Sequence, residues 1–374
     1  MKLIVDARVL SSRPCGIGMY AFRYINELRK NPEIELTLLT DVIVSQEIKA
    51  LENAGVPIVA YGKAIFRSAA VFEYFRFVAK ELRERQPDVF WEPNCLLPMG
   101  LPGYKGKLVV TIYDMFPLTM PDCFGWKYRM YFKHGVGQTV HRADLICYDS
   151  VEAQESTEAF FPEAKKKKSF VCYPIVDRGR KDKCGEDAGK AVSGNTQKEE
   201  AVPYFYYIGN VERRKGIDIL LKAYELYRAE GGHKGLKIAG GLKDECLKER
   251  LEQMKSVEGF SYLGYVSDDE KRELFRHCDT FVFPSRGEGF GIPILEAMSA
   301  GKPVIASRLS VFEEIIGDCI RFFDMEGTAD QQAAALCRAM RDEVRADLGA
   351  YEQVLGRYEK RKLGAAYAEQ LKSL

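Results

Sequence analysis

The sequence has few of the residues that hold metal ions. Its 374 residues include only four histidines, and its ten cysteines are scattered, the nearest two, Cys172 and Cys184, being twelve positions apart. Zinc sites and disulfide frameworks require closer pairs or mixed Cys/His clusters. We therefore expect no metal site and no disulfide framework, and thiols that stay reduced as they do in the cytoplasm.

Two further absences exclude other classes of protein. No uncharged stretch approaches the roughly 20 apolar residues of a membrane span, and the N-terminus, Met-Lys-Leu-Ile-Val-Asp, reaches a charge too early for a signal peptide. The formal net charge is only +1, so no overall field favours nucleic acid. We expect a cytoplasmic protein without a nucleic-acid partner, and contact with the inner face of a membrane stays open.

A complete dinucleotide fingerprint is also missing. Gly16 and Gly18 stand between a strand-like run and a helical pattern that begins near Ile17, but no third glycine follows. The incomplete pattern weakens the interpretation as a dinucleotide-dependent oxidoreductase. For the two glycines, closing a tight turn and contacting a ligand remain equally well supported.

The chain is long and apolar enough for two packed domains. Its hydrophobic fraction is 46%, and strand-like runs alternate with helical patterns, which predicts α/β domains with parallel sheets and helices on both faces. Residues 177–201 are rich in Gly, Ser, Asn, Glu and Lys, as in a flexible linker. We expect domains at 1–176 and 202–355, and a C-terminal helix at about 356–374.

Residues 281–301 form the most informative stretch. An apolar run is followed by a glycine-rich loop and a helix start, which include Gly287, Gly289, Gly291 and Ile292. A strand, a glycine loop and the positive end of a helix together predict a phosphate site. Glu288 and Glu296 flank this site, and carboxylates accept strong hydrogen bonds from sugar hydroxyls. The stretch therefore predicts a ligand that carries both phosphate and hydroxyl groups.

A second strand, loop and helix pattern lies at residues 204–224. Its loop, 209–216, contains Arg214 and Lys215 just before the helix. Cations at a helix start are unfavourable for the helix dipole, unless they reach a diphosphate. A solvated basic turn would be the better interpretation for this loop alone. The glycine-rich stretch that contains Glu288 favours the diphosphate.

The Glu288 to Glu296 pattern, within Gly-Glu-Gly-Phe-Gly-Ile-Pro and continuing through Glu-Ala-Met-Ser-Ala-Gly-Lys-Pro, resembles the signature of family 4 glycosyltransferases, and of their mannosyltransferase-like group. The resemblance implies a GT-B fold, in which two Rossmann-like domains with parallel sheets face a cleft. It implies that the first domain lies on the acceptor side, that the second binds the nucleotide sugar, and that the C-terminal helix at about 356–374 packs back on the first domain. It implies transfer of a hexosyl group, with retention of configuration, from a GDP- or UDP-sugar to an acceptor hydroxyl. No cofactor is implied, and the absence of Asp-x-Asp spacing agrees with a reaction that needs no metal.

The resemblance also implies roles for residues of the second domain. Arg214 and Lys215 would hold the diphosphate, Glu296 the ribose, and Glu288 the reacting sugar. The remaining residues of the expected donor site are Gly209, Gly264, Tyr265, Val266, Gly289, Phe290, Gly291 and Ile292. Asn210 departs from the pattern, because family members often have arginine there.

On the acceptor side the resemblance implies Gly16, Gly18, Tyr113, Asp114 and Asn94. Where the family has histidine, this chain has Tyr113, which supports the alternative of a noncatalytic nucleotide-sugar-binding protein. Asp114 and Asn94 have a second interpretation, because Asp and Asn commonly cap helices and turns.

Two segments, 66–77 and 124–133, mix aromatic and basic residues. Such a face suits a membrane surface or a lipid-linked acceptor, but aromatic residues at helical spacing are more often core, and we favour the core. The expected partners are a nucleotide sugar and a saccharide or lipid-linked acceptor, in the synthesis of a cell-surface polysaccharide or glycolipid.

Overall fold

The computed structural model describes residues 1–374 except 13, 15, 66–67, 99 and 177–201. The chain divides into two compact units, the first made of Met1–Ile175 and Tyr358–Leu374, the second of Val176–Arg357. The expected linker at 177–201 lies outside the described residues.

Seven parallel strands form the sheet of the first unit, in the order β3-β2-β1-β4-β5-β6-β7. The strands are β1 (Lys2–Asp6), β2 (Glu35–Thr40), β3 (Ile58–Ala60), β4 (Val89–Glu92), β5 (Lys107–Ile112), β6 (Leu145–Tyr148) and β7 (Lys168–Val171). The helices are α1 (Gly16–Leu28), α2 (Gln46–Asn53), α3 (Ser68–Arg85), α4 (Phe116–Thr119), α5 (Trp126–Arg142), α6 (Val151–Phe160) and α14 (Lys360–Lys372). Short 3-10 turns are η1 (Arg8–Leu10), η2 (Pro121–Cys123) and η3 (Pro162–Lys166).

Two cores lie on opposite faces of this sheet, as the alternation of side chains along a strand requires. Leu3 and Val5 of β1 belong to one core and Ile4 to the other, and Trp91 and Phe90 of β4 divide in the same way. Both faces therefore need apolar residues, which explains why these strands are continuous apolar runs.

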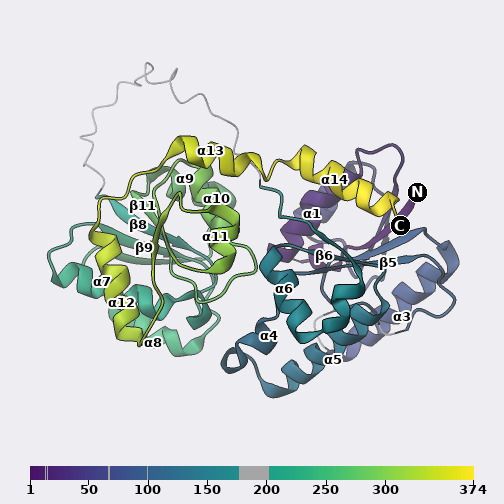
Figure 1. The fold of residues 1–374 in the computed structure, drawn as a ribbon, viewed down its shortest axis with the longest axis horizontal. Coiled ribbons are helices and arrows are strands. Elements are labelled where there is room, and N and C mark those ends of the chain that lie inside the picture. Colours follow the sequence, from purple (N-terminus) through teal and green to yellow (C-terminus); the bar gives the residue numbers. More distant parts are fainter. Residues whose placement is uncertain (13, 15, 66–67, 99, 177–201) are drawn as a thin grey trace, which may run out of the picture. The chain divides into compact units, whose positions relative to one another are not determined.

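The C-terminal helix α14 completes the first core. Tyr367 is fully buried, and its ring centroid lies 5.1 Å from those of both Tyr24 and Trp91. A Cβ atom at Gly364 would lie 2.5 Å from the Cβ of Glu27, so the absence of a side chain lets α14 approach α1 closely. Figure 1 shows α14, in yellow, beside α1, in purple.

Six parallel strands form the sheet of the second unit, in the order β10-β9-β8-β11-β12-β13. They are β8 (Tyr204–Ile208), β9 (Gly235–Ala239), β10 (Phe260–Gly264), β11 (Thr280–Phe283), β12 (Val304–Ser307) and β13 (Arg321–Phe323). The helices are α7 (Ile217–Ala229), α8 (Lys248–Met254), α9 (Asp268–His277), α10 (Ile292–Ser299), α11 (Ser310–Ile316), α12 (Ala329–Arg341) and α13 (Leu348–Gly356), with 3-10 turns η4 (Arg213–Lys215) and η5 (Glu245–Leu247).

The predicted α/β class with two parallel sheets is confirmed. The preference for a core role at residues 124–133 is wrong for most of that segment. Trp126, Tyr128, Met130 and Tyr131 have exposed fractions of 68%, 50%, 60% and 51%, whereas Phe132 is buried. In segment 66–77, Phe72 is exposed while Tyr74 and Phe75 are buried. Among the described helices, none has both the length and the apolar composition that crossing a membrane requires.

Candidate functional site

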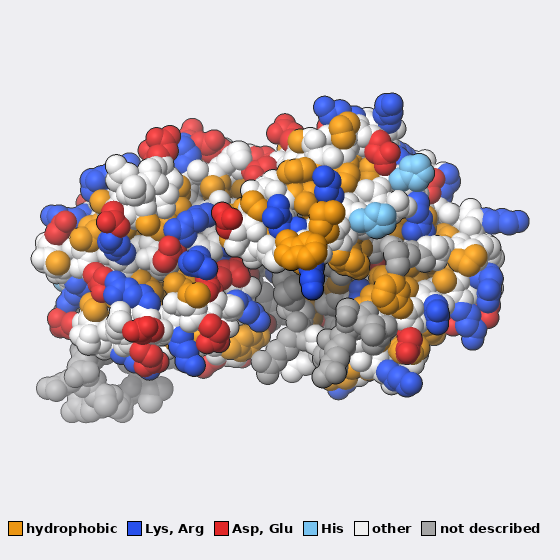
Figure 2. Space-filling view, turned by 90° about the horizontal axis from the view of Figure 1, so that it is seen from below, with side chains coloured by type: hydrophobic (Ala, Val, Ile, Leu, Met, Phe, Trp, Pro, Cys, Tyr) orange, Lys and Arg blue, Asp and Glu red, His pale blue; other side chains and the backbone are white. Residues whose placement is uncertain are grey.

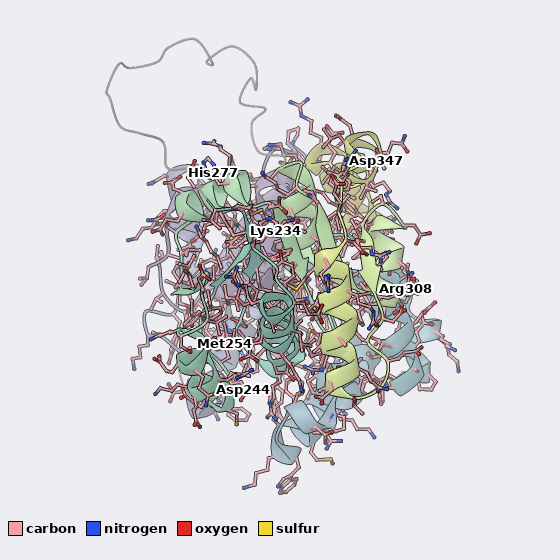
Figure 3. The ribbon with its side chains drawn as sticks, turned by 90° about the vertical axis from the view of Figure 1, so that its left-hand side faces the viewer. Lys234, Asp244, Met254, His277, Arg308 and Asp347 are labelled. Carbon is pink, nitrogen blue, oxygen red and sulfur yellow. The ribbon has the colours of Figure 1, made fainter. Side chains whose placement is uncertain are left out.

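Three glycine loops meet at the carboxyl ends of β8, β9 and β10. The Gly240 N–H donates to the Gly264 carbonyl oxygen (2.6 Å), and a Cβ at Gly240 would lie only 1.8 Å from the Gly209 carbonyl oxygen. The backbones of these loops therefore lie so close together that a side chain at Gly240 would not fit. Figure 3 labels Lys234, which comes just before β9, and Asp244, which comes after it. This edge of a parallel sheet is where ligands commonly bind.

Gly216 joins the loop after β8 to the loop after β11. It has φ of +70° at the start of α7, and a Cβ there would lie 1.8 Å from the Pro284 carbonyl oxygen. Only glycine combines this conformation with this contact. We call loops 209–216 and 284–291 together the cradle.

The cradle is held together by hydrogen bonds between its two loops. The Arg286 N–H donates to the Arg214 carbonyl oxygen (2.8 Å), and the Arg214 guanidinium donates to the Gly287 carbonyl oxygen (2.8 Å). Ser285, which is fully buried, donates its hydroxyl to the Gly287 carbonyl (3.2 Å). Both loops are thereby held in one conformation.

Lys215, predicted to hold the diphosphate, and Glu288, predicted to face the reacting sugar, form an ion pair. The Lys215 Nζ lies 2.6 and 2.5 Å from the two carboxylate oxygens of Glu288, and 5.7 Å from the centroid of the Phe283 ring. The side chains are only 15% and 8% exposed. Because little water reaches either group, each charged group is held in position by the other.

The other cations of the cradle are also matched. The Arg214 guanidinium donates to Glu212 (2.7 Å), and Arg286 makes a forked pair with Asp218 at 2.7 and 2.8 Å. Arg213 pairs with Asp244 at 2.7 Å. Carboxylates of the cradle and of its neighbouring segments thus hold the cations of the cradle in place.

The start of α10 closes the cradle. Gly291 has φ of +108°, and a Cβ there would lie 2.7 Å from the Phe312 ring. The helix begins at Ile292, as predicted, and no side chain caps it, so its first amides can meet an anion. Glu296 lies one turn into the helix, where its carboxylate accepts from Lys271 of α9 (3.0 Å).

The remaining predicted donor residues lie around these loops. Gly264 has φ of +65°, with open space where a Cβ would be, and it is followed by Tyr265, which is 71% exposed, and by the half-buried Val266. Phe290 is buried. The Tyr207 hydroxyl donates to the carbonyl of exposed Asn210 (3.0 Å), and burial, with Glu288 and Glu212 nearby, raises the pKa of Tyr207 well above its usual value.

The acceptor-side predictions fall in the first unit. Gly16 and Gly18 are the first turn of α1 and not a separate tight turn, and a Cβ at Gly18 would lie 2.6 Å from the Val9 carbonyl oxygen. Tyr113 is 6% exposed, and its hydroxyl donates to the Pro93 carbonyl (2.7 Å). The buried position gives Tyr113 a packing role that histidine would not fill in the same way.

Asp114 and Asn94 differ from each other. The Asp114 carboxylate accepts from the Phe116 N–H (3.0 Å), so it caps the turn before α4, as the second interpretation predicted. Asn94 is half-buried and lines a cavity at the carboxyl ends of β1, β2 and β4.

Some residues of the cradle had no sequence signal. Arg286 with Asp218, and Lys271 with Glu296, are 68 and 25 positions apart, so only the fold brings them together. Ser285 follows an apolar strand, and nothing in the sequence distinguishes it there from any other small residue. In the described part of the chain, no group of three or more His, Cys, Asp or Glu side chains is placed to hold a metal ion.

Sequence comparison identifies relatives of the chain. Residues 191–355 match the family model described as "Glycosyl transferases group 1". The chain is 28% identical over 362 residues to O-antigen chain mannosyltransferase B of Escherichia coli, covering 92% of this chain and 91% of that protein. It is 33% identical over 357 residues to serotype-specific mannosyltransferase WbdA of Escherichia coli, covering 88% of this chain and 41% of that larger protein.

Structural comparison agrees with these matches. Anabaena HepE, solved in complex with UDP and glucose, matches with a TM-score of 0.74 at 18% identity, and the match covers 100% of both chains. WaaG, a glycosyltransferase involved in lipopolysaccharide biosynthesis, matches with a TM-score of 0.69 at 14% identity and covers 99% of both chains. The matches identify this chain as a glycosyltransferase of the family 4 type, similar to the mannosyltransferases, with the GT-B fold.

Proposed function

We propose that this glycosyltransferase moves a mannosyl group from a nucleotide-diphosphate sugar to a saccharide acceptor during the synthesis of a cell-surface polysaccharide. The relatives named as O-antigen and serotype-specific mannosyltransferases support the sugar and the acceptor class. The HepE structure in complex with UDP and glucose supports a nucleotide diphosphate as the carrier. Binding of GDP-mannose against UDP-glucose decides between GDP and UDP as that carrier.

The cradle is the observation that carries this proposal. Arg214 and Lys215 lie on its first loop, and its second loop leads into the uncapped start of α10. Such cations and free N–H donors are what a diphosphate requires. Glu288 stands beside the same cations. We propose that Lys215 donates to both Glu288 and the diphosphate, so that Glu288 faces the sugar on which positive charge develops.

In this mechanism the protein stabilises the departing diphosphate with fixed donors. We propose attack on the same face, assisted by the leaving phosphate, with retention of configuration. The anomeric configuration of the first product, read by NMR, tests this step, and an inverted product contradicts it.

A donor screen tests the proposal as a whole. Thermal unfolding of the full chain is followed with GDP-mannose, UDP-glucose and their free diphosphates, and the best binder is then tested for slow hydrolysis and transfer. A ligand that binds the folded state at 100 times its Kd stabilises it by roughly 2.7 kcal/mol. Stabilisation by one nucleotide series, with turnover, supports the proposal; no binding by either series contradicts it.

We also propose that no metal takes part, because Arg214, Lys215 and the α10 amides supply the positive charge that a metal would supply. Activity should then persist in excess chelator. Loss of activity that Mn²⁺ or Mg²⁺ restores would contradict this point.

A second surface supports contact with a membrane. The N-terminal half of α5 exposes Trp126, Tyr128, Met130 and Tyr131. The basic residues Lys127 and Arg129 lie between them in the sequence, and Lys133 follows them. Figure 2 shows hydrophobic side chains beside Lys and Arg side chains over the region of α4 and α5. Aromatic and basic residues together fit the interface of an anionic lipid layer. We propose that this aromatic-basic face holds the protein at the cytoplasmic face of the membrane, near a lipid-linked acceptor.

Vesicle sedimentation tests this contact. Wild-type chain should bind vesicles with anionic phosphatidylglycerol more strongly than neutral phosphatidylcholine vesicles, and salt should weaken binding. The double variant Trp126→Ser/Met130→Ser should bind at least tenfold more weakly. Leu348→Ser is the control, because Leu348 is 62% exposed in the other unit. Equal binding by the double variant and the control would contradict the proposed contact.

A further inference from the structure

Lys271, a residue of α9, forms an ion pair with Glu296 of α10. Its Nζ lies 3.0 Å from one carboxylate oxygen of Glu296, and the two side chains are 25% and 21% exposed. The same Nζ lies 3.7 Å from Asp268, whose side chain is 85% exposed. Water competes less for the nearer and more buried carboxylate, so Glu296 is the main partner of Lys271.

The stability of α9 does not account for a lysine at this position. The helix begins with a capping box of Ser267 and Glu270, and its first turn is acidic, which suits the positive end of the helix dipole. A cation near the helix start is unfavourable for that dipole. The ion pair with Glu296 offsets this cost, so the lysine serves the contact between the two helices.

The ion pair occupies only one oxygen of the Glu296 carboxylate. Among the described residues, no hydrogen bond reaches the second oxygen. A glutamate side chain has three rotatable bonds, and fixing them costs conformational entropy. Because Lys271 already holds the carboxylate in the folded chain, a ligand that binds the second oxygen does not have to fix the side chain itself.

The same ion pair connects two segments of the expected donor site. Helix α9 follows directly after the segment that contains Gly264, Tyr265 and Val266. Glu296 lies one turn into α10, which begins at the cradle. Lys271 therefore fixes the spacing between these two segments, which are separate in sequence.

We propose that Lys271 is a positioning residue for the ribose of the donor nucleotide. By holding one oxygen of Glu296, it directs the other oxygen toward the ribose hydroxyls, which donate strong hydrogen bonds to a carboxylate. Lys271 itself touches neither the nucleotide nor the reacting atoms. This inference rests on the proposed function and on the predicted contact between Glu296 and the ribose.

Nucleotide binding to the full chain tests the inference. The probes are GDP and UDP, each compared with its 2′,3′-dideoxy form by isothermal titration calorimetry. In the wild-type chain, loss of both hydroxyls should weaken binding at least tenfold, because the carboxylate loses its hydrogen-bond donors. In Lys271→Met the same loss should weaken binding less than threefold. Equal binding of the two forms by the wild-type chain would overturn the ribose contact, and the positioning role with it.

The dideoxy nucleotide separates positioning from direct contact. If Lys271 acts only through Glu296, Lys271→Met should bind the dideoxy form as tightly as the wild-type chain does. Clearly weaker binding of the dideoxy form would mean that Lys271 contacts another part of the nucleotide, which would overturn the proposal. The double variant Lys271→Met/Glu296→Ala should bind GDP or UDP no more weakly than Glu296→Ala, because two residues that act through one contact are not additive. Lys271→Arg keeps a donor and should restore most of the preference for the ribose form.

Lys234→Met is the matched control. Lys234 forms an ion pair with Asp279, and these side chains are 20% and 35% exposed, so this variant also leaves a partly buried carboxylate without its cation. Lys234, labelled in Figure 3, directly precedes β9 and so lies at the amino end of that strand, whereas the glycine loops lie at the carboxyl ends. The control should keep the tenfold preference for the ribose form. Loss of the preference in both variants would indicate a general effect of destabilisation and would overturn the positioning role.

Transfer kinetics separate this inference from the proposed function. In Lys271→Met the donor KM should rise at least fivefold while kcat stays within twofold, which is the pattern of lost uniform binding. A tenfold preference for the ribose form that persists in Lys271→Met would overturn the positioning role and leave the proposed function standing. Absence of GDP and UDP binding by the wild-type chain would instead count against the proposed function, on which the positioning role rests.

Discussion

At the scale of single residues, the candidate site depends on a buried ion pair. Lys215 and Glu288 come from loops 73 positions apart, and each is the other's charged partner. If one partner is removed, the other is left buried and uncompensated, which typically costs about 3–5 kcal/mol of stability. The pair therefore couples the stability of the second unit to the geometry of its site.

Lys215→Met should reduce both activity and stability. Loss of one fixed donor to the diphosphate should cost about 2–4 kcal/mol of transition-state stabilisation, and Arg214→Ala should cost a similar amount. The double variant Lys215→Met/Glu288→Gln should regain much of the lost stability, because no charge remains buried alone, but none of the activity. Urea unfolding and kcat/KM measured on the same variants check both parts. A kcat/KM near the wild-type value in Lys215→Met would contradict the assignment of Lys215 as a donor to the diphosphate.

Substitutions of Glu288 and Glu296 should change different kinetic constants. Glu296, paired with Lys271 on the outer side of α10, is predicted to hold the ribose, whose bonding changes little during reaction. Glu296→Gln should therefore mainly raise the donor KM. Glu288→Gln removes a charge beside the reacting sugar and should mainly lower kcat. Steady-state kinetics with varied donor check this split, and reversed signatures would exchange the two roles.

The buried side chain of Glu92 should make the free energy of unfolding depend on pH. Because its pKa is raised in the folded chain, the folded state holds a proton that the unfolded state releases above the usual pKa of glutamate, about 4.3. Stability should thus fall as pH rises from that value toward the folded pKa. Glu92→Gln mimics the protonated form, so it should lose this dependence. Urea unfolding between pH 5 and about 8, with the exposed Glu52→Gln as control, checks it; parallel profiles for Glu92→Gln and wild type would contradict it.

At the scale of elements, the cradle depends on glycines, because its backbone segments approach so closely that no side chain fits between them. Gly216→Ala would place a Cβ against the Pro284 carbonyl at a positive φ. We expect a loss of more than about 1 kcal/mol, with weaker donor binding because the two loops separate. Gly241→Ala is the control, since a Cβ there meets no atom within 4 Å and φ is not positive. Urea unfolding and donor titration measure stability and donor affinity in both variants. Equal stability and equal donor affinity in Gly216→Ala and Gly241→Ala would contradict the prediction.

The sequence predicted the elements whose signals are local. Strand-like runs that alternate with helical patterns predicted α/β domains with parallel sheets on both sides of the linker, and both sheets are parallel in the structure. The short strand β13 (Arg321–Phe323) was not predicted, because its three residues include an exposed arginine. It forms because pairing with the neighbouring strand β12 overrides a weak local preference.

The same division between local and distant signals holds for the site. Gly291, Ile292, Arg214 and Lys215 lie in local motifs, so their loops were found from sequence. Pairs that form across the fold were not, and neither was the exposure of Trp126. A helical aromatic pattern indicates one face, but it does not say whether protein covers that face.

At the scale of the whole molecule, the first unit is completed by the last residues of the chain. Residues 358–374 belong to it although the second unit precedes them in sequence. The first unit therefore buries Trp91 and Tyr24 fully only after the entire chain is present. This order makes the stability of the first unit depend on α14.

Tyr367→Ala tests that dependence. The fully buried Tyr367 ring contacts those of Tyr24 and Trp91, and replacing a buried aromatic residue by alanine typically costs about 3–5 kcal/mol. The two tryptophans of the chain, Trp91 and Trp126, are both in the first unit, so tryptophan fluorescence during urea unfolding reports on this unit. Its midpoint should fall clearly in Tyr367→Ala and stay near wild type in Leu348→Ala, whose side chain is exposed in the second unit. An unchanged fluorescence midpoint in Tyr367→Ala would mean that α14 contributes little to the first unit, and the close packing at Gly364 would then need another explanation.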